Sequence, residues 1–201
     1  MDVILDKPLM LSPTQVSSEP FRYFVSTQGF SYEASLIILK WLETDAPWKL
    51  VEAEFYEQYE FNFLDACLPP QLKFLQEKSF LADLREKVEN MFQVELSDRI
   101  DLNAHKLVPG QRIRLHNDYI PDQETHRLII QLNRGWTDEQ GGLLMFFNSS
   151  NPADIHKVIL PFHNSVVGFA ISRNSNHAVS TIRNGQRFSL VYSFYEKNGY
   201  A

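Results

Sequence analysis

The sequence is poor in cysteine, with Cys67 the only one among 201 residues. A single thiol cannot form a disulfide within the chain, so packing and hydrogen bonding must hold the fold together. Because apolar neighbours such as Leu64 and Leu68 flank it, Cys67 is expected to be a small buried hydrophobe rather than a nucleophile. The lack of disulfides favours a reducing compartment, and we expect the chain to be cytoplasmic.

Long hydrophobic runs are also absent. No segment approaches the roughly 18 consecutive apolar residues of a membrane span, and residues 1–7 lack the basic-then-apolar pattern of a signal peptide. Blocks of basic residues are missing too, and the net charge is −6. Because nucleic acids bind mainly through lysine and arginine contacts to phosphate, this charge disfavours a nucleic-acid partner. We therefore expect neither a membrane nor a nucleic acid among the partners.

Hydrophobic periodicity divides the chain into two parts of one expected domain, residues 1–201. Residues 1–98 mix helical and strand patterns and are predicted to be a support region. Apolar residues recur at three- and four-residue steps over 32–44 and 80–92, which predicts two amphipathic helices, the second capped by Ser79. The aromatic run at 55–63 favours core packing or a strand over a substrate groove.

From residue 99 to residue 196 the hydrophobic period changes to two, which is typical of β-strands. Eight short strands are predicted at 101–107, 112–116, 127–133, 142–147, 156–160, 165–171, 177–182 and 187–195. Turn residues such as Pro109-Gly110 and Gly141-Gly142 separate them, and no helical pattern intervenes. The fold class is therefore expected to be mainly β with supporting N-terminal helices, and the strand count favours a double-sheet jelly roll.

Three residues of this β region form a candidate metal site. His116 ends a predicted strand and lies two residues before Asp118, so both side chains can reach one cation. In a jelly roll the second strand pairs with the seventh, which brings His177, at the start of the seventh, next to His116. Two imidazoles and one carboxylate leave three positions of an octahedral ion open, which suits non-haem Fe(II) and oxygen chemistry.

A basic residue on the last strand completes this expectation. Arg187 lies ten residues after His177, and Ser189 shares its face of the strand. A guanidinium can pair with the distal carboxylate of a 2-oxo acid, and a hydroxyl can add a hydrogen bond. Arg187 and His177 would face opposite ways if Asn184-Gly185 were a hairpin tip. We therefore predict that Asn184-Gly185 is a turn between two sheets.

The order of these motifs resembles the prolyl 4-hydroxylase-like Fe(II)/2-oxoglutarate-dependent dioxygenases. The residues that carry the resemblance are Pro109-Gly110, His116-x-Asp118, Leu132-Asn133 with Trp136, Gly141-Gly142-x-Leu144, His177 and Arg187. The resemblance covers about residues 100–196 and implies a double-stranded β-helix core over 99–196. It implies Fe(II), 2-oxoglutarate and O2 as cofactors, with succinate and CO2 as coproducts, and it is compatible with ascorbate as a reductant. Gln131 stands where the family's hypoxia-sensing members have a tyrosine that helps to hold 2-oxoglutarate.

The resemblance favours hydroxylation of an amino-acid side chain in a peptide or protein, and alternatives stay open. A free amino acid or small natural product could be the substrate, and desaturation or cyclisation could replace hydroxylation. A non-enzymatic jelly-roll binding module and a cupin-type metalloenzyme that uses His126 or His163 are two further readings. Arg114, which would alternate with His116 on one face of the strand, is a candidate substrate contact.

Overall fold

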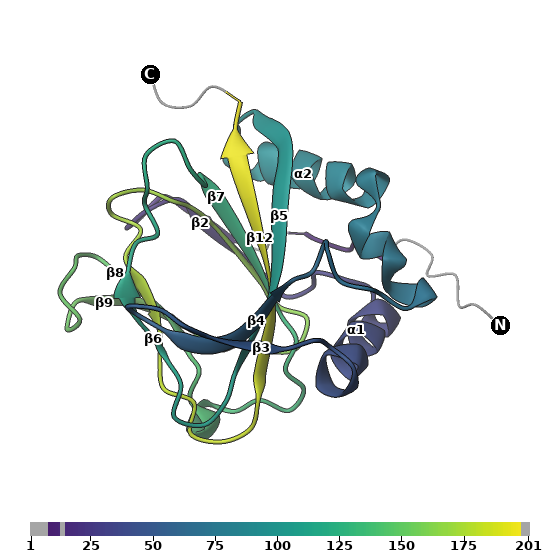
Figure 1. The fold of residues 1–201 in the computed structure, drawn as a ribbon. Coiled ribbons are helices and arrows are strands. Elements are labelled where there is room, and N and C mark those ends of the chain that lie inside the picture. Colours follow the sequence, from purple (N-terminus) through teal and green to yellow (C-terminus); the bar gives the residue numbers. More distant parts are fainter. Residues whose placement is uncertain (1–7, 13–14, 198–201) are drawn as a thin grey trace.

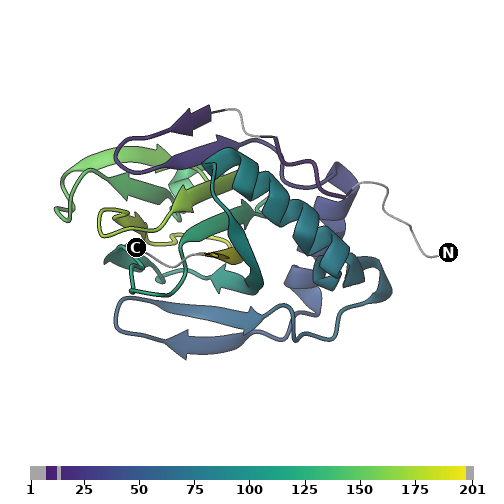
Figure 2. The same ribbon diagram turned by 90° about the horizontal axis from the view of Figure 1, so that it is seen from above.

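A computed structural model describes residues 8–12 and 15–197, and in it two antiparallel β-sheets face each other (Figure 1). Residues 1–7, on which the signal-peptide expectation rests, lie outside the described residues. Helices cover the outer face of the larger sheet, and the smaller sheet packs against its inner face (Figures 1 and 2). Within the described part of the chain, no helix is long and apolar enough to cross a membrane.

The large sheet has eight strands in the order β1-β2-β10-β7-β12-β5-β4-β3. Their bounds are β1 Gln15–Ser17, β2 Tyr23–Ser26, β10 Val166–Ala170, β7 His126–Gln131, β12 Arg187–Glu196, β5 Leu96–Leu107, β4 Glu57–Asn62 and β3 Lys49–Glu52. The small sheet has the order β6-β11-β8-β9, with β6 Ile113–His116, β11 His177–Val179, β8 Leu144–Phe147 and β9 Ile155–Ile159. Each of the eight strands predicted from the period of two is present, and the two facing sheets are the arrangement expected of a jelly roll.

Three helical elements pack on the outer face of the large sheet: α1 Tyr32–Thr44, η1 Pro70–Gln76 and α2 Lys78–Phe92. Both predicted helices are confirmed. A fourth, short element, η2 Asp138–Gln140, lies in the turn before β8. Ser31 caps α1 by accepting a hydrogen bond from the Ala34 N–H. The prediction that Ser79 caps the second helix is wrong, because that helix begins at Lys78, two residues earlier than predicted, and its N-cap Glu77 makes no side-chain cap hydrogen bond.

Strand β12 shows how the two faces of the large sheet differ. Its residues are buried from Arg187 to Phe194. Phe188, Leu190, Tyr192 and Phe194 belong to the core under the helices. Arg187, Ser189 and Val191 alternate with them and therefore face the small sheet. Because β11 and β12 lie in different sheets, the prediction that Asn184-Gly185 is a turn between sheets is confirmed.

Residues before position 98 are built into the large sheet. Strands β1 to β4 make up half of its eight strands, with β2 paired to β10 and β4 to β5. The expectation of a buried Cys67 is wrong: its thiol is exposed in the segment between β4 and η1. Flanking apolar residues did not predict burial there, because Cys67 belongs to no regular element that would turn it toward the core.

Candidate metal centre

The three predicted ligands meet at the edge of the small sheet. His116 ends β6 and His177 begins β11, and these two residues are partners in the antiparallel register. Asp118 follows in the turn after β6, where its φ of 57° is the left-handed conformation that aspartate tolerates better than most residues. One ligand atom from each of the three side chains lies within 4.8 Å of the others. The structure therefore brings together the set that the sequence predicts.

The two imidazoles are oriented for metal binding. His116 Nδ1 lies 2.8 Å from the Arg114 carbonyl oxygen, and His177 Nδ1 lies 2.7 Å from the Ser175 carbonyl oxygen. Since a carbonyl only accepts, each Nδ1 must carry the proton, which leaves the lone pair on Nε2. The Nε2 atoms of His116 and His177 lie 3.3 Å and 3.0 Å from the Asp118 carboxylate oxygens. Two nitrogen donors and one oxygen donor thus converge on one point.

Arg127, on β7, fixes the charge state of this cluster. Its guanidinium forms ion pairs with Asp118 and with Glu124. Burial opposes ionisation of Asp118, but the charge of the Arg127 guanidinium outweighs it and holds the pKa of that carboxyl well below its usual range. Burial lowers the pKa of His177, so the imidazole is neutral near pH 7. An ionised carboxylate and neutral imidazoles are the protonation states that a divalent metal requires.

A second polar group lies deeper between the sheets. Arg187 is only 3% exposed, and its Nε has no hydrogen-bond partner. Its Nη1 donates to the Ser189 hydroxyl at 3.4 Å, and no carboxylate of the described residues pairs with it. Burial lowers the pKa of Arg187 to about 10, which leaves it charged near pH 7. A buried cation without an anion is the condition that a ligand carboxylate would relieve.

Gln131 and Gly142 shape the surroundings of Arg187. Gln131 is fully buried, lies opposite Ser189 in the register of β7 and β12, and has no hydrogen-bond partner on either amide atom. A Cβ on Gly142 would lie 2.9 Å from Arg187 Cδ, so only glycine leaves room for the guanidinium stem. The unpaired atoms of Arg187 and Gln131 fit the carboxylate end of 2-oxoglutarate, and the histidine–aspartate set fits Fe(II).

The metal centre opens into a cavity of about 240 Å³, called the inner pocket here. Its walls are Phe55, Tyr56, Gln58, Glu60, Asn103, His105, Ile113, His116, Asp118, Arg127, Val191 and Ser193. Phe55 stacks on the His116 ring, with centroids 4.4 Å apart. The aromatic run at 55–63 does form strand β4, as predicted, but its first residues also line this pocket. The sequence did not reveal these pocket residues, because they reach the pocket through a contact with β6 that joins segments far apart in the chain.

Arg114 does not line the inner pocket. With Arg112 it lines a separate outer groove of about 600 Å³, together with Glu52, Ala53, Glu54, Phe55, Tyr56, Glu57, Tyr59, Val108, Pro109, Gly110 and Gln111. The register between β6 and β11 shifts between Ile113 and His116, so these two residues, rather than Arg114 and His116, face the pocket. The expectation that Arg114 and His116 share one face of the strand is therefore wrong, because β6 contains an irregularity that the sequence does not reveal.

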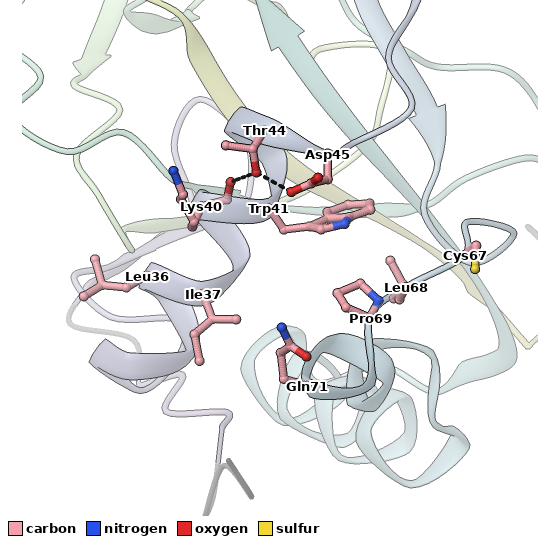
Figure 3. Close-up of a pocket in the computed structure, with 10 residues that line it drawn as sticks. All are labelled: Leu36, Ile37, Lys40, Trp41, Thr44, Asp45, Cys67, Leu68, Pro69 and Gln71. Atoms are coloured by element: carbon pink, nitrogen blue, oxygen red, sulfur yellow. Dashed lines mark hydrogen bonds between the residues drawn. The ribbon is translucent and has the colours of Figure 1, made fainter. Parts of the chain in front are cut away.

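Neither of the other histidines considered for a metal joins the cluster, which is the only such group found in residues 8–12 and 15–197. His126 packs on Phe92 under α2, and His163 Nε2 lies 3.1 Å from the Ser35 hydroxyl. Another cavity, of about 840 Å³, is remote from the metal centre (Figure 3). It lies between α1 and the segment 67–71, on the helical side of the large sheet, and holds no metal-ligand cluster.

Comparison with known proteins agrees with this geometry. Residues 102–194 match the model of the 2OG-Fe(II) oxygenase superfamily. Prolyl 3-hydroxylase sudestada1 of Drosophila melanogaster is 24% identical over 181 residues, which cover 84% of this chain and 33% of the relative. The chain thus spans about a third of that curated relative's length.

Solved structures show the same architecture. A Pseudomonas putida prolyl-4-hydroxylase superposes with a TM-score of 0.65 at 19% identity, covering 82% of this chain and 85% of the other. A Trichoplax adhaerens prolyl hydroxylase, solved with a hypoxia inducible factor peptide fragment, gives 0.64 at 11% identity, covering 87% and 84%. These likenesses confirm the jelly-roll fold class.

Proposed function

We propose that the chain is a prolyl hydroxylase-like member of the 2OG-Fe(II) oxygenase superfamily, whose model matches residues 102–194. In this proposal it hydroxylates an amino-acid side chain, foremost proline, in a peptide or protein. The single observation that carries the proposal is the convergence of His116, Asp118 and His177 beside the buried, unpaired Arg187. A structural metal site would not need a cation that is buried between the same two sheets without a carboxylate partner.

The peptide or protein substrate is supported by the relatives. The curated relative is a prolyl 3-hydroxylase, and the structural neighbours include prolyl 4-hydroxylases and an enzyme bound to a peptide fragment. The outer groove of about 600 Å³, lined from the end of β3 to Arg114 on β6, adjoins the inner pocket and is where we place the chain on either side of the target residue. Phe55 and Tyr56 line both cavities and would lie where a target side chain passes from one to the other.

Each polar residue has a part in this scheme. His116, Asp118 and His177 would hold Fe(II), and Arg127 keeps the Asp118 carboxylate ionised and in place. Arg187, Ser189 and Gln131 would bind the distal carboxylate of 2-oxoglutarate. Fe(II) with 2-oxoglutarate and O2 supplies the oxidation, in which one oxygen atom enters the substrate C–H bond and the other enters succinate as CO2 leaves. Phe55 stacks on the His116 ring and would help to hold this ligand in place.

Anaerobic titration tests the proposal directly. Adding Fe(II) and then 2-oxoglutarate to the purified chain should produce a visible charge-transfer band that neither component gives alone. His177→Ala should lose the band, because all three protein ligands are needed to hold the metal and this change removes one of them. The matched control is His156→Ala, since His156 is exposed and bonds only to Asn148. A folded wild-type chain that gives no band would overturn the oxygenase assignment and favour a binding module.

A further inference from the structure

The wall of the inner pocket opposite the histidines carries a group of hydrogen-bond acceptors on β4 and β5. Glu60 on β4 and His105 on β5 are partners in the register, and both line the pocket with His116 and Asp118. Gln58 Nε2 donates to Glu60 Oε2 at 2.8 Å, and His105 Nε2 lies 3.9 Å from the same oxygen. Gln58 is 2% exposed, yet its Oε1 has no hydrogen-bond partner.

No cation of the described residues neutralises Glu60. Arg127, the one guanidinium in the pocket wall, is engaged by Asp118 and Glu124. Burial, reinforced by Arg127 and Arg187, lowers the pKa of His105 to about 3, so that this imidazole is neutral near pH 7. Lys49 lies opposite Glu60 in the register of β3 and β4, but it is exposed and forms no ion pair with Glu60 within 4 Å.

We infer that Glu60 and Gln58 form a specificity site for a positively charged group of the substrate, an ammonium or a guanidinium, next to the carbon that is oxidised. This inference rests on the proposed function and names the substrate class for the same pocket. A partly buried carboxylate beside an unpaired amide oxygen offers acceptors alone, and a cationic nitrogen offers several donors. A proline ring without such a group would leave Glu60 Oε1 and Gln58 Oε1 facing an apolar surface, which is unfavourable.

The cationic group can come from two sources, a lysine or arginine side chain next to the target residue or an α-amino group. The pocket volume of about 240 Å³ admits one side chain with a short neighbour. Three blocked amino acids test the side chain: the N-acetyl methylamides of lysine, arginine and glutamine. Alanine amide carries only the α-ammonium group. N-acetylalanine amide is its uncharged control. Calorimetric titration of these five probes needs no turnover and uses the full chain as purified.

Wild-type protein should bind the blocked lysine or arginine probe at least about tenfold more tightly than the glutamine probe, or alanine amide more tightly than N-acetylalanine amide. Glu60→Gln is close to isosteric and should reduce the ratio of affinities for charged and uncharged probes to within about twofold. The midpoint of urea denaturation should stay unchanged. The matched control is Glu86→Gln, an exposed acid on α2 that lines neither the inner pocket nor the outer groove, and it should keep the wild-type preference. Equal affinity for charged and uncharged probes in the wild-type protein overturns the inference.

Hydroxylation assays on blocked proline hexapeptides separate this inference from the proposed function. Peptides with lysine beside proline should gain oxygen faster than matched glutamine peptides in the wild type, and Glu60→Gln should lose that ratio. If the anaerobic band forms and both peptides are hydroxylated equally, the cation site is wrong and the oxygenase stands. If the band never forms, the oxygenase assignment fails, and a preference of the calorimetric probes that depends on Glu60 would then mark a cation-binding module.

Discussion

Arg187 is a cation that the fold buries without a carboxylate to neutralise it. Replacing it by methionine keeps an unbranched apolar stem in the space beside Gly142 and removes the buried charge. We expect Arg187→Met to leave the ligand-free chain as stable as the wild type or more stable. The same change should abolish the rise in melting temperature that 2-oxoglutarate with Fe(II) gives the wild type, since that rise reports binding to the folded state alone.

Differential scanning fluorimetry with and without both ligands measures the two effects. The exposed Arg183→Met is the control and should keep the ligand-induced rise. A clear fall in the stability of ligand-free Arg187→Met would contradict this account, because it would show that the arginine serves the fold itself.

Single residues were predictable where local spacing or the known strand pairing of a jelly roll places them. His116 and Asp118 are two apart at a strand end, and His177 opens the strand that a jelly roll pairs with it. Glu60 and Arg127 could not be predicted, because their positions in the pocket wall follow from the register of β4 on β5 and of β7 on β12. Arg114 was misplaced for the related reason that β6 is irregular.

At the scale of elements, α2 stabilises the molecule from the side of the large sheet that lies away from the metal. Leu84 is fully buried on α2, within the core that also contains Leu102 of β5 and Leu190 of β12. Leu84→Ala leaves a cavity there and should lower the free energy of unfolding by about 2–5 kcal/mol, as measured by urea denaturation. In the anaerobic titration, the charge-transfer band of the folded variant should have the same amplitude and the same midpoint concentration of 2-oxoglutarate as that of the wild type. The reason is that no metal ligand belongs to this core.

The exposed neighbour Asp83→Ala serves as the control and should change stability by less than about 0.5 kcal/mol. Loss of the band in a folded Leu84→Ala chain would show that the helix positions the metal ligands through the sheet.

Helices and strands differed in how completely the sequence specified them. The three- and four-residue steps of α1 and α2 are local, and both helices were found within two residues of their predicted bounds. The hairpin formed by β3 and β4 was harder, because its tip pairs with β6 through the bridge between Tyr56 and Ile113. That contact joins residues far apart in sequence and closes one side of the inner pocket, and no period within residues 49–62 reveals it.

For the molecule as a whole, function depends on two sheets being held face to face. The metal ligands come from the small sheet and the turn after β6, while Arg187, Ser189, Gln131 and Glu60 come from the large one. A mainly β composition with turn residues at regular spacing predicted both sheets. It could not predict that residues before position 98 would provide half of the large sheet, since strand order is set by long-range pairing.

Buried histidines should make the stability of this whole assembly depend on pH. Burial, with a smaller contribution from Arg22, lowers the pKa of His126 to about 4, below its ordinary value of 6.5. The unfolded chain therefore takes up a proton between about pH 6.5 and pH 4 that the folded chain does not, and the folded state loses stability as the pH falls through that window. The loss from His126, which is 4% exposed, amounts to roughly 3 kcal/mol once the pH is below 4.

Urea denaturation at about pH 7 and about pH 4 measures this loss, and His126→Gln should shrink the difference between the two values by roughly 2 kcal/mol. His105, whose pKa burial lowers to about 3, acts in the same direction and would keep part of the acid sensitivity in that variant. The exposed His156→Gln should leave the difference unchanged. An equal acid sensitivity in His126→Gln and wild type would mean that carboxylates such as Asp118, held ionised by Arg127, rather than His126, govern acid unfolding.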